Sequence, residues 1–181
     1  AASIAPFHID FPVLPGSMNF DRQFVLSDDG INAPLYRQGT LLIQRTTSKK
    51  TGRRVIGALV TGDLFSLRRG YYVENHVNVI QNEPSSSNGN NQSLLWGLTG
   101  WVNSRLLNFV FDMMNGSAHI STYELNLLPL PVELVPLLST PAQKVARASG
   151  REYGKMYEEL DSMVSDYFHL TKKQVKRLKE K

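Results

Sequence analysis

The residues of this chain that could do chemistry are cations concentrated in one short stretch. Residues 45–70 hold seven cations and one acid, whereas the residues before them hold two cations and four acids. The seven cations are Arg45, Lys49, Lys50, Arg53, Arg54, Arg68 and Arg69. A cationic cluster without matching acids is typical of a surface that binds a polyanion, and a solvated loop is the plain alternative. The cluster therefore predicts contact with phosphates rather than bond-making chemistry.

Motifs that would indicate catalysis or a bound metal are absent from the sequence. It contains no cysteine, no His-Glu-x-x-His, no Gly-x-Ser-x-Gly, no Gly-rich phosphate loop and no Asn-Pro-Pro-aromatic tetrapeptide. His8 with Asp10, and Glu74 with His76, are pairs without a third partner nearby in the sequence. We therefore expect a binding module that has no catalytic site, no metal and no cofactor of its own.

The basic cluster is predicted to lie on a β-hairpin. Apolar runs at residues 41–44 and 55–60 flank a segment that contains Thr, Ser and Gly, a pattern typical of two strands and a turn. A further strand is predicted at residues 71–81. Asn75 and His76 lie at an expected bend in that strand, which makes them candidates for DNA contact beside the basic tip.

The middle of the chain is predicted to contain a buried helix pair. The apolar stretch after a polar, low-complexity loop favours helices at residues 93–102 and 104–115, separated by an Asn-Ser pair that suits an N-cap. Ser-Thr-Tyr-Glu then gives a second cap signal before a brief turn. The polar loop that leads into this turn adds three candidates for DNA contact, which are His119, Ser121 and Thr122.

The last forty residues are predicted to form a helical tail. Thr140 opens one capping box and Thr171 opens another, which begins a short basic helix at residues 172–181. We interpret that basic helix as a solvated end rather than a DNA contact. An apolar stripe at helical spacing is formed by Leu160, Met163, Val164 and Tyr167. The predicted fold class is α+β, with a strand-rich recognition domain at residues 1–139 and the tail at residues 140–181.

The composition is that of an ordinary globular protein, with 41% hydrophobic and 20% charged residues. No apolar run approaches the roughly 20 residues that a transmembrane helix needs. The N-terminus lacks the features of a signal peptide and also lacks an initiating Met. We therefore expect a cytoplasmic location, no membrane partner, and a longer parent polypeptide.

Three segments, in this order, resemble one family. LLWGLTGWVNSRLLNFVFDMMNG followed by SAHISTYELNLLPLP resembles the end of target recognition domains, both in type I restriction specificity subunits and in adenine-N6 DNA methyltransferases. LDSMVSDYFHLTKKQVKRL resembles the closing helix of type II and IIG methyltransferases. The basic hairpin, with Glu74-Asn75-His76 downstream, looks like the methyltransferase version, the TaqI-like specificity domain.

This resemblance covers most of residues 40–181 and implies a function. It implies a sequence-specific module that binds double-stranded DNA for an adenine-N6 methyltransferase, with or without a fused nuclease. The methyltransferase domain would lie upstream in the same polypeptide and would bind S-adenosylmethionine. The cations of the hairpin would contact phosphates or read guanine, and the target adenine would be flipped into the upstream domain.

Three alternatives stay open on the sequence. A type I specificity-subunit fragment would need long helices, whereas Gly150 and Gly154 are expected to interrupt those of the tail. A protein-interaction module without a DNA role would use the basic tip on an acidic partner. An RNA-binding protein would favour aromatic residues among the cations, and residues 45–54 contain none.

Overall fold

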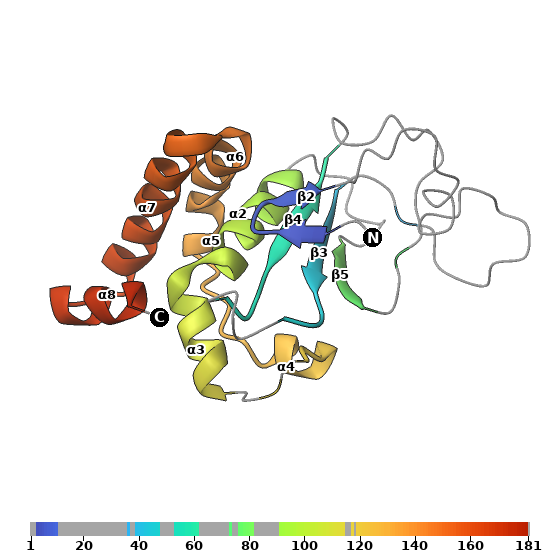
Figure 1. Cartoon of the computed structure of the whole chain (residues 1–181), viewed down its shortest axis with the longest axis horizontal. Coiled ribbons are helices and arrows are strands. Elements are labelled where there is room, and N and C mark those ends of the chain that lie inside the picture. The colour runs from blue at the N-terminus through green and yellow to red at the C-terminus, as the bar shows by residue number, and fades with distance from the viewer. Residues whose placement is uncertain are drawn as a thin grey trace, which may run out of the picture.

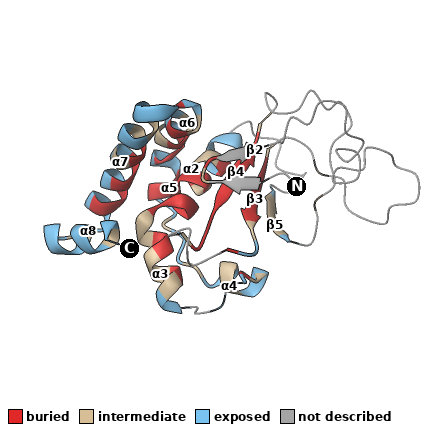
Figure 2. Ribbon diagram, viewed as in Figure 1, coloured by how far each residue is buried: buried red, intermediate tan, exposed pale blue. Residues whose placement is uncertain are grey.

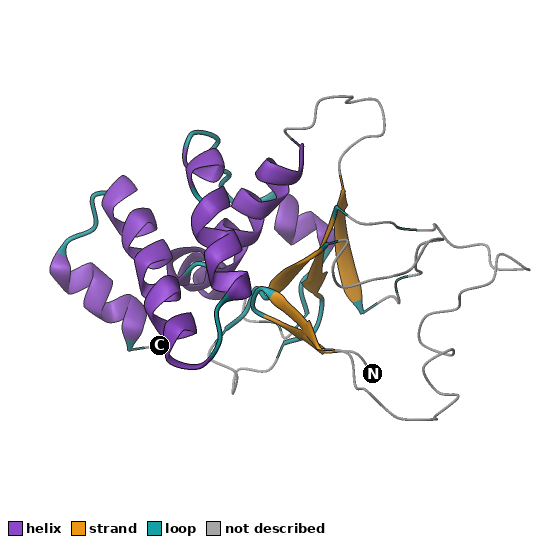
Figure 3. Cartoon of the chain, turned by 90° about the horizontal axis from the view of Figure 1, so that it is seen from above, coloured by secondary structure: helices purple, strands orange, loops and turns teal. Residues whose placement is uncertain are grey.

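The structure, a computed structural model, describes residues 3–10, 36, 39–47, 53–61, 73, 76–81, 91–114, 117 and 119–180. This part of the chain is a mixed α+β fold, as predicted, with the strands on one side and the helices on the other (Figures 1 and 3). The strands are β1 (Ser3–Ala5), β2 (His8–Asp10), β3 (Thr40–Gln44), β4 (Gly57–Val60) and β5 (Val77–Gln81). The helices are α2 (Asn91–Asn103), α3 (Arg105–Met114), α4 (Thr122–Asn126), α5 (Leu134–Leu137), α6 (Ser139–Arg147), α7 (Gly150–Tyr167) and α8 (Lys172–Lys179).

The central sheet has three antiparallel strands in the order β4-β3-β5, so β3 is paired on both sides. Leu41 of β3 lies opposite Leu59 of β4 and Ile80 of β5. Because successive side chains of a strand point to opposite faces, Leu41 and Leu42 pack into different clusters. The predicted hairpin is confirmed in its two strands. Strands β1 and β2 form a separate antiparallel pair.

The main hydrophobic core lies between the sheet and the helices. Figure 2 shows the buried residues running from β3 and β4 through α2 into α6 and α7. At Gly57 an added Cβ would lie 2.9 Å from Val102 Cγ2, so the glycine lets α2 approach β4 closely. At Gly97 an added Cβ would lie 1.9 Å from the Val135 carbonyl oxygen. Glycine at this position therefore allows the α5 backbone to lie directly against α2.

Two buried asparagines tie the helix pair to the edge of β4. Asn103 accepts a hydrogen bond from Gly57 N (3.1 Å) and donates one to Gly57 O (2.7 Å). Asn108 Oδ1 accepts from Arg54 N and Val55 N, both at 2.8 Å. The predicted break between the helices is confirmed, since Ser104 Oγ accepts a hydrogen bond from Leu107 N at 3.2 Å. Side-chain amides therefore satisfy the backbone at the start of β4 and in the segment before it, and Gly57 O also accepts from Phe7 N at 3.0 Å.

The helical tail packs on the rest of the molecule. The core cluster that contains Leu41 also contains Val145 of α6 and Leu160 and Val164 of α7. At Gly100 of α2, an added Cβ would have its nearest neighbours on α6, on α7 and at Leu138, all within 3.3 Å. The tail thus contributes to the same core as the sheet.

Several expectations about the tail are wrong in detail. Thr140 does not cap α6, because that helix begins at Ser139 and its N-cap, Leu138, makes no side-chain cap hydrogen bond. The amide of Leu138, which directly follows α5, donates to Leu134 O in the first turn of that helix, so the chain passes from one helix into the next without an extended cap residue. Gly154 does not interrupt α7, which is continuous over 18 residues. Met163 and Tyr167 are exposed rather than part of the buried stripe.

The predicted strand at 71–81 is described only in part. β5 begins at Val77, His76 lies in the preceding turn, and residues 71, 72, 74 and 75 lie outside the described residues. The capping boxes at Ser121 and Thr171 are both confirmed. None of the helices in the described ranges is long and apolar enough to cross a membrane.

Candidate nucleic-acid interface

Four polar side chains from three separated segments line one open hollow of about 250 Å³. Arg45 follows β3, His76 precedes β5, and His119 and Ser121 lie in the loop before α4. All four are among the residues that the sequence predicts for DNA contact. Arg45, His76 and His119 are exposed and Ser121 is half-buried. We call this hollow the groove.

The groove is assembled by main-chain hydrogen bonds on both sides of Arg45. Arg45 N donates to His76 O (2.9 Å), and Ile120 N donates to Arg45 O (2.7 Å). Thr46 and His119 form an isolated antiparallel bridge, with Thr46 Oγ1 and His119 Nδ1 3.2 Å apart. The chain therefore keeps pairing for two residues beyond the end of β3 and aligns two other segments beside it.

Ser121 forms one wall of the groove and also caps α4. Its Oγ accepts from Glu124 N at 3.2 Å, and its own amide donates to Glu124 Oε2 at 2.7 Å. Ser121 Oγ also donates to Glu124 Oε2 at 2.8 Å, and the hydrogen bonds that the carboxylate accepts from the Ser121 amide and hydroxyl lower the pKa of Glu124, with the charge of Arg54 adding to the effect. Glu124 is thus an ionised carboxylate held in place by the cap.

Thr122 and Asn78 join β5 to the same loop. Asn78 is buried, and its Nδ2 donates to Ile120 O at 2.9 Å. Thr122 Oγ1 donates to Asn78 Oδ1 at 3.3 Å. These two hydrogen bonds hold the loop to β5, and Thr122 itself is exposed. Asn78 supports the groove and was not predicted from the sequence. The signal that could have identified it is an Asn within the apolar run of β5.

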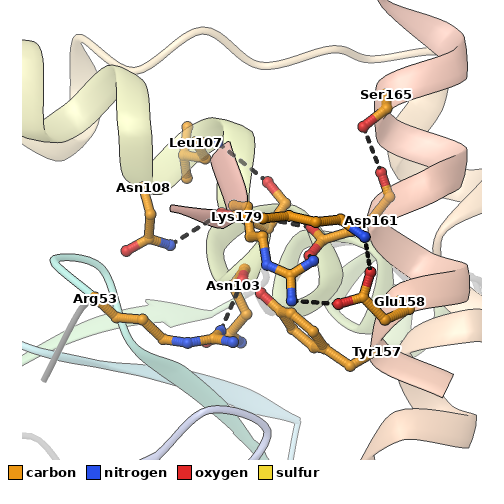
Figure 4. A network of polar contacts seen from close by, with 11 residues as sticks. Arg53, Asn103, Leu107, Asn108, Tyr157, Glu158, Asp161, Ser165 and Lys179 are labelled. Atoms are coloured by element: carbon orange, nitrogen blue, oxygen red, sulfur yellow. Dashed lines mark hydrogen bonds and ion pairs between the residues drawn. The ribbon is translucent and has the colours of Figure 1, made fainter. Parts of the chain in front are cut away.

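Arg53 lies away from the groove, at the junction of the sheet with α2 and α7. Its Nη1 donates to Asn103 O at 3.0 Å, and its guanidinium lies 4.3 Å from the centre of the Tyr157 ring (Figure 4). Tyr157 OH donates to the same Asn103 oxygen. This half-buried arginine therefore packs between α2 and α7 and makes a cation–π contact with Tyr157.

The expectation that Arg54 belongs to an exposed basic tip is wrong. Arg54 is 4% exposed, and its Nη1 lies 3.8 Å from Asp112 Oδ1 of α3. The physical reason is the capture of its backbone, since Asn108 accepts from Arg54 N and Thr47 Oγ1 donates to Arg54 O at 3.0 Å. These hydrogen bonds draw the segment against α3 and bury its side chain.

The remaining predicted contacts are not described. They are Lys49, Lys50, Arg68, Arg69 and Asn75, which lie outside the described residues. The structure therefore brings together Arg45, His76, His119 and Ser121 and places Thr122 next to them, whereas Arg53 packs on α2 and α7 and Arg54 is buried against α3.

The side chains that line the groove are suited to binding a ligand. The groove offers a guanidinium, two imidazoles and a hydroxyl, which are donors and acceptors suited to phosphate oxygens and base edges. Over the described residues, no three His, Asp, Glu or Cys side chains gather in a way that could hold a metal ion. Comparisons with protein-family models, curated proteins and solved structures each found no match.

Proposed function

We propose that this chain binds double-stranded DNA through the groove formed by Arg45, His76, His119 and Ser121. The observation that carries the proposal is the convergence of these four side chains from three segments on one open hollow. Residues 45 and 119 are 74 positions apart, so no local structure requires them to meet. Side chains that a surface gathers from distant segments, and leaves exposed, are typical of binding sites.

The size of the groove favours a polymer over an enclosed small molecule. Pockets that bind drug-sized ligands have volumes of about 300–1,000 Å³ and bury most of the ligand. The groove is smaller, at about 250 Å³, and it is open. A hollow of this kind suits a single phosphate or the edge of one base of a larger partner. Arg45 suits such contacts because a guanidinium can bind phosphate or guanine with two parallel hydrogen bonds.

The proposal extends to the biological role of a specificity domain. The order of motifs in residues 40–181 resembles the target recognition domains of adenine-N6 DNA methyltransferases, which supports sequence reading on behalf of a methyltransferase domain. In this proposal the methyltransferase domain and its S-adenosylmethionine belong to another part of the polypeptide. The same proposal describes the chain as a strand-rich recognition module and places it in the cytoplasm.

A protein-interaction module is the second candidate, and exposed apolar side chains favour it. Leu127, Leu130, Val132 and Leu137 are each more than half exposed along the segment from α4 to α5. Clustered apolar exposure of this kind is typical of protein interfaces. The two functions are separable by experiment, because DNA binding depends on salt and on the groove.

The test is a fluorescence-anisotropy titration of mixed-sequence duplex DNA between about 50 and 200 mM salt. We expect the Kd to rise steeply with salt, since each phosphate contact contributes about −0.9 to the slope of log affinity against log salt. Arg45→Gln with His119→Gln should weaken binding about tenfold or more, with a flatter slope. Arg147→Gln, an exposed cation on α6, is the matched control and should change neither quantity.

The outcomes separate the candidates. Binding that is absent, insensitive to salt or unaffected by the groove variant would overturn the DNA proposal and favour the protein-interaction module. Sequence reading is tested by selecting bound duplexes from a random library. Recovery of a shared motif that contains adenine supports a methyltransferase specificity domain, whereas recovery of random sequences refutes that part of the proposal.

A further inference from the structure

The C-terminal helix α8 is fixed to the molecule and does not form a frayed end. Thr171 caps it, with Thr171 N donating to Gln174 Oε1 at 2.8 Å. The turn before it is closed by Leu170 N, which donates to Ser165 O at 2.9 Å, and by His169, whose φ of 51° lies in the left-handed region. These features set the direction of α8 relative to α7.

Two further contacts hold α8 along its length. Val175 and Leu178 are half-buried and line a small hollow of about 120 Å³ against α3 and α7. Lys179 Nζ lies 2.6 Å from Glu158 Oε2, and Glu158 also accepts from Arg105 (Figure 4). The hydrogen bond from Arg105, with a second from Lys179, lowers the pKa of Glu158 to about 2, so this anchor stays ionised.

The outward face of α8 carries four cations. Lys172, Lys173, Lys176 and Arg177 are exposed, and their spacing puts them on the side of the helix opposite Val175 and Leu178. Lys176 forms an ion pair with Glu180 of the same segment at 3.6 Å. Among the described residues, no acid lies within ion-pair distance of the other three.

Part of this arrangement opposes the stability of the helix itself, whereas Lys176 and Arg177 lie in the last turn, where cations are favoured. The N-terminal end of a helix is positive, so Lys172 and Lys173 in the first turn are unfavourably placed. No acid occupies that turn. Lys172 with Lys176, and Lys173 with Arg177, are also like-charge pairs four residues apart, which repel each other. A well-capped helix that keeps two cations in its first turn and two like-charge pairs on one face makes that face a candidate binding surface.

We propose that the outward face of α8 is a second contact for the phosphate backbone of duplex DNA, separate from the groove. This inference rests on the proposed DNA-binding function. From Lys172 to Arg177 the helix rises about 7.5 Å, and duplex DNA carries one charge per about 1.7 Å of its axis. That charge is divided between two strands, so each strand carries one phosphate per about 3.4 Å, and the four cations face about two phosphates of the nearer strand.

An anionic membrane surface is the other polyanion that a basic helix can bind. Helices that lie on membranes insert an apolar face among the lipids. The apolar residues of α8, Val175 and Leu178, are turned toward α3 and α7. Duplex DNA is therefore the partner that this helix fits better.

The test compares two triple variants of the full chain in the salt series. Lys172→Gln, Lys173→Gln and Arg177→Gln together should reduce the slope of log affinity against log salt by about 2 and weaken binding about tenfold or more. Lys144→Gln, Arg147→Gln and Lys155→Gln remove the same charge from exposed positions of α6 and α7 and should leave the slope unchanged. Thermal unfolding followed by circular dichroism should show both variants folded, because all six side chains are exposed.

The groove variant measured in parallel distinguishes failure of this inference from failure of the proposed function. A wild-type slope for the α8 variant, while the groove variant loses affinity, overturns the α8 contact and leaves the groove in place. Absence of duplex binding by the wild-type chain overturns both. Binding to phosphatidylserine vesicles that the α8 variant loses, at an unchanged DNA slope, assigns α8 to a membrane surface and also overturns the inference.

Discussion

Replacement of Asn108 should lower the free energy of unfolding. Its Oδ1 accepts from Arg54 N and Val55 N, and its Nδ2 donates to Val102 O at 3.2 Å and Ser104 O at 3.0 Å. Asn108→Ala leaves two buried backbone N–H groups without an acceptor. Each unsatisfied group costs about 1–3 kcal/mol, so we expect a loss of about 3 kcal/mol in the free energy of unfolding.

Urea unfolding followed by circular dichroism measures this loss. With a denaturant slope of about 2 kcal/mol/M, the midpoint should fall by about 1.5 M. Amide hydrogen exchange gives a local check, because the amides of Arg54 and Val55 should lose protection before the amides of the sheet. Asn126→Ala, at an exposed position of α4, is the matched control and should change stability by less than about 0.5 kcal/mol. A midpoint for Asn108→Ala close to that of the wild type, with both amides still protected, would refute the reasoning.

Two further predictions concern the buried carboxyl of Asp161 and two helical glycines, Gly97 and Gly154. Burial raises the pKa of Asp161 to about 6, so the folded state holds this proton more tightly than the unfolded state, where the pKa is about 3.8. The resulting stability is fully present below pH 3.8 and is lost as pH rises through about 6. Asp161→Asn keeps an acceptor for Arg105 N but cannot ionise. The free energy of unfolding of the variant, minus that of the wild type, should therefore rise by roughly 1–3 kcal/mol between pH 4 and pH 6. A difference in urea midpoints that does not change with pH would contradict this. Gly97→Ala should destabilise by at least about 1–3 kcal/mol, because its Cβ would overlap the Val135 carbonyl. Gly154→Ala, in open space within α7, should instead stabilise by about 0.5–1 kcal/mol, and thermal unfolding compares the two.

Local sequence signals predicted the elements that depend on neighbouring residues. The helix pair around Ser104 and the capping boxes at Ser121 and Thr171 were found because a cap needs only a side chain and an amide three residues away. The α+β class followed from the change of hydrophobic period along the chain. Local signals failed at Thr140, where α5 continues almost directly into α6.

Features that depend on distant residues could not be predicted in the same way. The burial of Arg54 follows from Asn108, which lies 54 positions later, and a cluster of cations gives no hint of that partner. The meeting of Arg45 with His119 depends on a bridge between residues 73 positions apart. The sequence therefore identified four of the groove residues by type, but their position in one site depends on tertiary pairing.

The groove is framed by main-chain hydrogen bonds, so its framework does not depend on which side chains line it. The amide and carbonyl of Arg45 bind His76 and Ile120, and these groups are present in every amino acid except proline, which lacks the amide. The side chains of Arg45, His76 and His119 are exposed, and the main-chain hydrogen bonds beneath them do not depend on side-chain type. Ligand preference at this surface can thus diverge by point substitution while the scaffold beneath it is conserved.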